Sequence, residues 1–250
     1  MIGSPLLLAR QPMLPIHSVG VIVGSFDPLH RGHQWMVQQM SRRFELVLLL
    51  VPVAHFEKTV RFPHNATRAQ RVELIERVHR GQPVIGGLTR ELLFVRLIEH
   101  LARQLPGVQV GLGLGSDTYG KLLRSRSYFA WLGLPWGPAE EQALSRLAEQ
   151  SVVFARDRHV DLPAGALVPP THLRGISSTL VRRRAVLLHA ARAGAGRWHD
   201  ELGPLVGPEV VSFIRELGLY GRGPCLRRIA RQAAPTPWAV LSSSPATERA

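Results

Sequence analysis

The feature that most constrains the fold is an alternation of short apolar runs with longer amphipathic segments. Two of the runs, "VGVIVG" at 19–24 and "ELVLLLVPVA" at 45–54, are rich in branched side chains, which is typical of buried strands. Segments with helical periodicity follow them, and Thr67 is a suitable N-cap for one of these. This order predicts an α/β fold with a Rossmann-like, doubly wound parallel sheet. The expected helices span about 31–43, 67–80, 92–105, 139–150, 178–193 and 207–220, and further strands span 108–115 and 151–156.

Length and composition predict one domain with loose ends. The chain has 250 residues, of which 45% are hydrophobic, so it can bury a sizeable core. Residues 1–18 are expected to be a loose leader, and residues 221–250, rich in Pro, Ser and Arg, a mobile tail. The domain is then expected to span residues 19–220. Cys225 is the single cysteine, so no intrachain disulfide can form, and no apolar run reaches the roughly 18 residues of a membrane span, which predicts a cytoplasmic protein.

The charge balance favours an anionic partner. Lys and Arg together number 31 against 18 Asp and Glu, a formal net charge of +13. Such a balance is typical of proteins that bind nucleic acid, acidic lipid or phosphate-rich small molecules, although solvated surface arginine would produce it too. No basic patch interleaved with aromatic residues supports nucleic acid, and no apolar span supports a membrane. The charge balance alone therefore predicts an anionic partner and leaves its class open.

The string "GSFDPLHRGH" at 24–33 follows the first predicted strand. Ligands of parallel sheets bind at the carboxyl ends of the strands, and exposed N–H groups at a helix N-terminus favour phosphate. His30 and His33 share one helix face and could be metal ligands, a catalytic pair or ordinary helix residues. Gly24 allows a tight turn, and Gly32 removes a side chain that would block a ligand. Because no third ligand has suitable spacing, a metal site held by protein ligands is not favoured.

This string resembles the signature of the nucleotidylyltransferase superfamily, with its His-x-Gly-His core. The match is close to the branch that includes the nicotinamide and nicotinate mononucleotide adenylyltransferases. "GISSTLVRRR" at 175–184 is similar to the ISSTxxR signature of that branch, and "GLGSDTYGKL" at 113–122 is similar to its Gly-x-Asp strand end. "VVFARD" and "VGPEVVSFIRELGLY" resemble later elements, so the resemblance covers about residues 19–220, with the motifs in the family's order.

The resemblance implies transfer of a nucleotidyl group from a nucleoside triphosphate to an anionic acceptor, with release of pyrophosphate. His30 and His33 would stabilise charge on the phosphates, and Arg182 would bind a phosphate bidentately. Asp117 would contact the ribose or a hydrated metal, and Mg²⁺, held mainly by phosphates and water, is the implied cofactor. Taken alone, the Ser-Ser-Thr run would predict only a helix cap. The implied nucleotide-binding residues are Gly24, Ser25, Phe26, Gly115, Asp117, Ile176, Ser177, Ser178 and Thr179.

The acceptor side departs from the family's pattern. Lys58 and Arg71 match its basic residues after the second strand and in the following helix, and Lys58 would meet the acceptor or the triphosphate. A solvated helix face is the alternative for Arg71. In "GGLTRELL" at 86–93, Thr89 matches the family's TxDTL segment and Arg90 adds a charge, while a glutamate replaces the aspartate and the flanking aromatic is absent. Lys58, Arg71, Thr89 and Arg90 are the expected acceptor-binding residues.

Two substrate pairs fit these motifs. The first is ATP with nicotinate or nicotinamide mononucleotide. The alternative is a specialised cytidylyltransferase that uses CTP and a small phosphonate such as phosphonoformate, because added arginine suits a small acidic acceptor better than a flat pyridine. A nucleotide-binding regulator without turnover is a third possibility, against which the intact His30, His33 and Arg182 argue.

Overall fold

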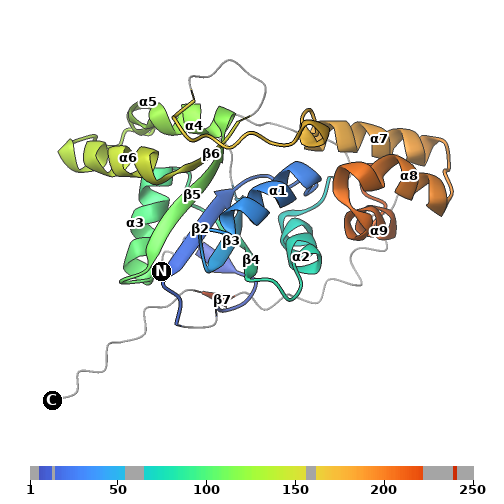
Figure 1. The fold of residues 1–250 in the computed structure, drawn as a ribbon, viewed down its shortest axis with the longest axis horizontal. Coiled ribbons are helices and arrows are strands. Elements are labelled where there is room, and N and C mark those ends of the chain that lie inside the picture. The colour runs from blue at the N-terminus through green and yellow to red at the C-terminus, as the bar shows by residue number, and fades with distance from the viewer. Residues whose placement is uncertain (1–5, 13–14, 54–64, 156–161, 222–238, 241–250) are drawn as a thin grey trace.

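A computed structural model describes residues 6–12, 15–53, 65–155, 162–221 and 239–240 (Figure 1). Within these residues seven strands form one sheet in the order β6-β5-β2-β3-β4-β1-β7. The strands are β1 (Leu6–Leu8), β2 (Ser18–Val23), β3 (Leu46–Pro52), β4 (Val84–Thr89), β5 (Gln109–Gly115), β6 (Val152–Phe154) and β7 (Ala239–Val240). The helices are α1 (Arg31–Met40), α2 (Arg68–Val78), α3 (Phe94–Gln104), α4 (Ser116–Leu123), α5 (Ser125–Trp131), α6 (Pro138–Gln150), α7 (Ser178–Ala190), α8 (Ala195–Val206) and α9 (Pro208–Glu216), with a short 3₁₀ helix at Thr171–Leu173.

The sheet has helices on both faces, as a doubly wound fold requires. Strand β3 is buried along its whole length: Val47 and Leu49 belong to one hydrophobic core, and Leu48 and Leu50 belong to the other. Residues from α1, α2, α7, α8 and α9 fill the first core, and residues from α3 to α6 fill the second. Because successive side chains of a strand point to opposite faces, a continuous apolar run such as β3 fits a strand covered on both sides. The predicted fold class is confirmed.

The strand order places a topological switch point next to β2. Strands β2, β3 and β4 follow one another across the sheet in one direction, and β5 then returns to pair with the opposite side of β2. All of these pairings are parallel, so β2 and β5 end at the same edge. The winding direction reverses between them, and ligands of open α/β sheets bind outside the carboxyl ends of strands at such a switch point. The segments at the ends of β2 and β5 carry Gly24, Ser25, Phe26, Gly115 and Asp117 of the predicted nucleotide-binding residues, and the others lie at the start of α7.

The edge of the sheet differs from the prediction. Leu6–Leu8 forms β1, which pairs antiparallel with β4 and has Leu6 and Leu8 fully buried, so the expectation that residues 1–18 are a loose leader was wrong there. Burial of these two leucines stabilises the pairing. In the expected tail, residues 221–250, Ala239–Val240 pairs antiparallel with β1. Most of the remaining tail lies outside the described residues, and the division of the chain at residue 220 stays a prediction.

Strand β4 depends on a glycine that leaves room for β1. A Cβ atom at Gly87 would lie 2.8 Å from the carbonyl oxygen of Leu7 and 2.8 Å from Cδ2 of Leu8. The first of these atoms is backbone and cannot move without disturbing the strand pairing. We therefore expect Gly87→Ala to lower the free energy of unfolding by about 1–3 kcal/mol, measured by denaturant titration.

The matched control for this change is Gly196→Ala. Gly196 is exposed in α8 with no heavy atom within 4 Å of a Cβ, so its replacement should raise stability by about 0.5–1 kcal/mol. A Gly87→Ala protein as stable as the wild type would show that β1 does not pack against β4 in solution.

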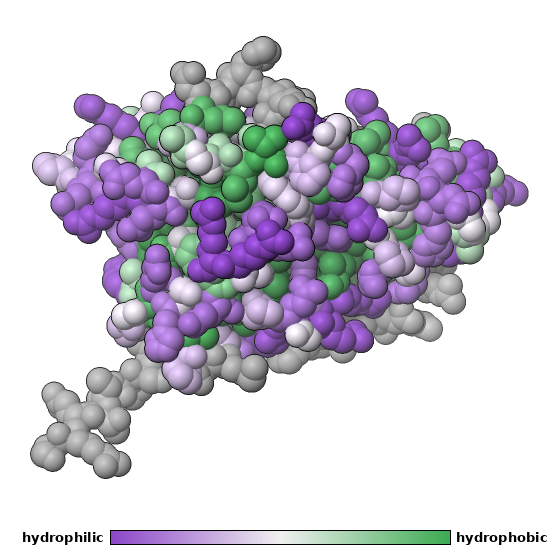
Figure 2. Space-filling model, in the orientation of Figure 1, coloured by the Kyte–Doolittle hydropathy of each residue, from purple (hydrophilic) through white to green (hydrophobic). Residues whose placement is uncertain are grey.

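The face shown in Figure 2 carries both apolar and hydrophilic residues. Apolar residues gather over α4 and α5, where Leu123, Trp131 and Leu132 are exposed, and hydrophilic residues cover much of the remainder. None of the helices within the described part of the chain has the length and apolar character needed to cross a membrane.

Candidate active site

The two motif histidines lie against each other at the start of α1. Their rings stack with centroids 3.7 Å apart and planes 24° apart. The backbone N–H of His30, the N-cap residue, donates to Nδ1 of His33 at 3.3 Å. A ring nitrogen that accepts carries no proton, so the neutral His33 ring carries its proton on Nε2 and can donate from there. The predicted pair is therefore brought together, with His30 buried beneath a more accessible His33.

Neighbouring motif residues hold this pair in place. A Cβ atom at Gly32 would lie 3.0 Å from Cε1 of His30, so Gly32 makes room for a histidine ring, where we expected it to make room for a ligand. Phe26, expected among the nucleotide-binding residues, is 1% exposed and meets His33 edge-on at 5.1 Å. Gly24 in turn makes room for Phe26, because a Cβ there would lie 2.9 Å from the phenyl ring. The side chain of Phe26 is thus placed to support His33.

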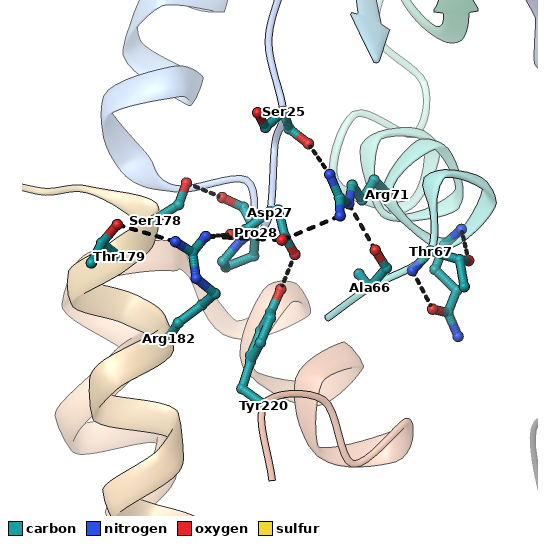
Figure 3. A network of polar contacts seen from close by, with 11 residues as sticks. Ser25, Asp27, Pro28, Ala66, Thr67, Arg71, Ser178, Thr179, Arg182 and Tyr220 are labelled. Atoms are coloured by element: carbon teal, nitrogen blue, oxygen red, sulfur yellow. Dashed lines mark hydrogen bonds and ion pairs between the residues drawn. The ribbon is translucent and has the colours of Figure 1, made fainter. Parts of the chain in front are cut away.

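The second motif begins α7 and is tied directly to the first. Ser177 is the N-cap residue, and its Oγ accepts from the backbone N–H of Leu180 at 3.2 Å. The hydroxyl of Ser178 donates to the carbonyl oxygen of Pro28 at 3.0 Å (Figure 3). Both hydroxyls belong to residues expected to bind the nucleotide, but here they bond within the protein. The N–H groups of the first helical turn, which have no intrahelical acceptor, are the groups with which such a terminus binds anions.

Arg182 lies one turn into α7 and reaches the same loop. One terminal nitrogen donates to the carbonyl oxygen of Asp27, and the other donates to Oγ1 of Thr179 at 3.1 Å. Its side chain is 13% exposed, and it lies 3.9 Å from the carboxylate of Asp27. Because Asp27 directly precedes the Pro-Leu-His30 segment, this contact joins the predicted phosphate-binding arginine to the histidine motif.

Asp27 is a central residue of the site that the sequence reasoning missed. It is 4% exposed and accepts from the hydroxyl of Tyr220 at 2.7 Å, while Arg71 lies 3.2 Å from its other carboxylate oxygen (Figure 3). Arg71 also donates to the carbonyl oxygens of Ser25 at 3.2 Å and Ala66 at 2.8 Å. Its guanidinium therefore faces the motif loop, which differs from the acceptor contact expected of it. The one signal in the sequence was a carboxylate inside a motif that handles anions.

Burial of the Tyr220 hydroxyl makes its titration a probe of this network. Burial first, and then the neighbouring carboxylate of Asp27, raise the pKa of Tyr220 well above its ordinary value of 10.0. The native state keeps a proton that the unfolded chain loses, so this residue makes the free energy of unfolding fall as pH rises above about 10. Tyr220→Phe should remove that part of the alkaline slope and cost about 1–3 kcal/mol at pH 8, because Asp27 loses a donor. Urea titrations from pH 8 to 11 measure the loss of stability at pH 8 and the slope of the free energy of unfolding against pH. A Tyr220→Phe protein with the wild-type slope would contradict the placement of the hydroxyl.

The segment after β5 supplies the other predicted nucleotide contacts. Gly115 is the N-cap of α4, and a Cβ there would meet no heavy atom within 4 Å, so the backbone faces open space. Asp117 is exposed in the first turn of α4, and its contact with a ribose stays a prediction. Ile176 is 6% exposed and immediately precedes the N-cap of α7.

Two of the residues expected to bind the acceptor, Thr89 and Arg90, lie at the end of β4, which β3 separates from β2 in the sheet. Thr89 is fully buried, and its Oγ1 accepts from the backbone N–H of Glu91 at 3.1 Å, which fixes the turn after the strand. Arg90 is exposed at this edge. Burial, the largest effect, raises the pKa of the half-buried Glu91 carboxyl above its ordinary value. Lys58, which we expected on the acceptor or triphosphate, lies outside the described residues.

Comparisons with known proteins agree with this geometry. The chain belongs to the cytidylyltransferase-like family, whose sequence model matches residues 21–184. It is 29% identical over 228 residues to a probable nicotinate-nucleotide adenylyltransferase of Marinobacter nauticus, covering 80% of this chain and 95% of that protein. A probable nicotinate-nucleotide adenylyltransferase of Halorhodospira halophila is 30% identical over 117 residues, 42% of this chain and 50% of that protein.

Solved structures show the same fold. The Plasmodium falciparum nicotinic acid mononucleotide adenylyltransferase complexed with APC aligns with a TM-score of 0.54 at 14% identity, over 82% of this chain and 97% of that one. Its complex with NaAD aligns with a TM-score of 0.55 at 13% identity, over the same shares of both chains. Together with the family match, these similarities make the chain a nucleotidyltransferase, in the branch that resembles the mononucleotide adenylyltransferases.

Proposed function

We propose that the protein transfers the adenylyl group of ATP to nicotinate mononucleotide, forming a dinucleotide and releasing pyrophosphate. The observation that carries the proposal is the joining of two phosphate-handling motifs. The stacked His30 and His33 begin α1, and Arg182 of α7 is bonded to the loop that leads into them. This assembly follows β2, at the point where the sheet reverses its winding. The name of the Marinobacter nauticus relative, which matches 80% of this chain, supports the choice of substrates.

The geometry suits an in-line displacement that needs no proton-accepting residue. A phosphate oxygen of the acceptor attacks the α-phosphorus, and the bond from that phosphorus to the bridging oxygen breaks, with its electron pair leaving on pyrophosphate. The Nε2–H of His33 and the guanidinium of Arg182 would donate to the oxygens on which negative charge grows. The first turn of α7 would hold the departing pyrophosphate. The side chains therefore position two anions and offset their charge.

Magnesium would enter with the triphosphate. Across the ranges that the structure describes, no group of three or more His, Cys, Asp or Glu side chains could hold a metal ion. The buried carboxylate of Asp27 is engaged by Arg71 and Tyr220. These residues fit an ion coordinated by phosphates and water, and the exposed Asp117 would bind one of those waters. Bound in that way, Mg²⁺ would neutralise part of the triphosphate charge.

A second candidate function follows from the end of β4. Thr89 turns its hydroxyl into the protein, and the exposed Arg90 adds positive charge at the edge where the acceptor would bind. This surface suits a compact, strongly acidic acceptor, so transfer of CMP from CTP to a small phosphonate is the alternative. In that reaction too, Lys58 and Arg90 would bind the acceptor.

A matrix of substrates tests both candidates. ATP and CTP are each incubated with nicotinate mononucleotide, nicotinamide mononucleotide or phosphonoformate in the presence of Mg²⁺, and pyrophosphate is followed. We expect the fastest release with ATP and nicotinate mononucleotide. Release confined to CTP with phosphonoformate would establish the alternative and reject the pyridine acceptor. Tight triphosphate binding without release from any pair would indicate a nucleotide-binding regulator.

A further inference from the structure

The carboxylate of Asp27 divides its two oxygens between separate parts of the chain. Oδ1 accepts from the hydroxyl of Tyr220, which follows α9, at 2.7 Å. Oδ2 lies 3.2 Å from a terminal nitrogen of Arg71 in α2 and 3.9 Å from a terminal nitrogen of Arg182 in α7 (Figure 3). Two guanidinium groups thus approach one buried oxygen, and Arg71 is the nearer of them.

The two arginines are held differently. Arg71 is fixed by the carbonyl oxygens of Ser25 and Ala66, and it makes the shorter contact with the carboxylate. Arg182 donates instead to the backbone oxygen of Asp27 and to Thr179. The three charged side chains sum to +1. Arg71 thus makes the closer ion pair with Oδ2, and Arg182 makes the longer one.

From this arrangement we propose that Arg71 is a positioning residue that acts on Arg182 through Asp27. By holding the carboxylate, Arg71 prevents it from closing into a direct ion pair with Arg182, and so keeps the positive charge of Arg182 directed at the phosphates of the triphosphate. The inference rests on the proposed function of Arg182 as a phosphate-binding group. We had expected Arg71 to contact the acceptor. The inference gives it instead a role in binding the triphosphate.

Tyr220 completes the arrangement without adding charge. Its hydroxyl is protonated at neutral pH and donates to Oδ1. The loss of Arg71 would then free Oδ2, whose nearest remaining cation in the network is Arg182. A move of less than one ångström would bring the two groups from 3.9 Å into direct ion-pair contact.

Binding of ATP and of CTP, measured by calorimetry without acceptor, tests the inference in three variants. Arg71→Gln should weaken triphosphate binding about tenfold, because Asp27 then neutralises Arg182. Adding Asp27→Asn to Arg71→Gln should bring binding back to within about threefold of the wild type, since the site regains a net charge of +1. Arg71→Lys keeps the charge and should also stay within about threefold. Arg77→Gln is the control, because Arg77 lies in the same helix but pairs with Glu73 and Glu216.

The outcomes separate a charge effect from a structural one and from an acceptor contact. A double variant that binds no better than Arg71→Gln would overturn the inference, and so would a change confined to the KM of the acceptor. If the Arg71→Gln protein does not fold, the Arg71→Lys variant decides the question. A folded Arg71→Lys protein whose triphosphate binding is weakened tenfold or more would also overturn the inference. Because no acceptor is present, a wild type that binds triphosphate but never releases pyrophosphate rejects the proposed function and leaves this inference standing.

Discussion

Replacing His33 by alanine is expected to slow pyrophosphate release about 100- to 1,000-fold. The ring of His33 is held by three contacts: it stacks on His30, meets Phe26 edge-on and accepts the backbone N–H of His30. Because Nδ1 accepts that N–H, the neutral ring carries its proton on Nε2, from where it would donate to the oxygens of the transferring phosphate. The substitution removes that donor from a partly accessible position, so the fold should survive it. Initial rates at saturating substrates measure the loss of activity, and a thermal melt shows whether the fold is preserved.

His199→Ala serves as the control for this experiment. His199 lies in α8 with partial exposure and outside the motifs, so its loss should leave the rate within about twofold of the wild type. An unchanged rate in folded His33→Ala would refute the assignment of the site. Equal losses in both variants would point to a general defect.

Replacing Arg182 by glutamine should have the next largest effect. The change removes a cation that the structure holds at the loop before His30, so we expect kcat to fall about 100-fold and triphosphate affinity to fall about tenfold. Glutamine can still donate a hydrogen bond toward the Asp27 carbonyl, which limits the structural cost. Steady-state kinetics with varied triphosphate and saturating acceptor separate kcat from KM.

Arg183→Gln provides the matched comparison in the same helix. Arg183 is the next residue along α7 and is exposed, so its replacement removes the same charge from the surface. Its kinetics should match those of the wild type at physiological salt, where exposed charges are screened. If both variants lost the same amount of affinity, a diffuse basic surface would explain triphosphate binding and the specific role of Arg182 would be rejected.

The sheet's centre was predictable, whereas its edge was not. Continuous apolar runs marked β2 and β3, and Thr67 was correctly predicted as the N-cap of α2, where its hydroxyl accepts from Gln70. Strand β4 gave a weak signal because Gly86 and Gly87 interrupt its apolar run. Those glycines are explained by neighbours distant in sequence, such as β1, which packs where a Cβ of Gly87 would lie. Local patterns do not contain that information.

The candidate site, too, was predictable only in part. Sequence motifs identified His30, His33 and Arg182, because each of these residues lies in a short string whose residue types and spacing are recognisable without the rest of the chain. The Asp27 network joins residues up to 193 positions apart, so no local pattern pointed to Tyr220. Arg71 could be recognised as a functional position, but its hydrogen bonds depend on where α2 places it against the motif loop.

The central claim is that one phosphate-handling site, formed by His30, His33 and Arg182, performs nucleotidyl transfer. The most direct measurement is the product balance of wild type and His33→Ala with ATP, nicotinate mononucleotide and Mg²⁺, followed by chromatography with mass detection. We predict that the wild type forms nicotinate adenine dinucleotide and pyrophosphate in equal amounts, and that both products fall together in His33→Ala. Formation of the dinucleotide at the wild-type rate by His33→Ala, or pyrophosphate from the wild type without any nucleotidyl adduct, would contradict the account.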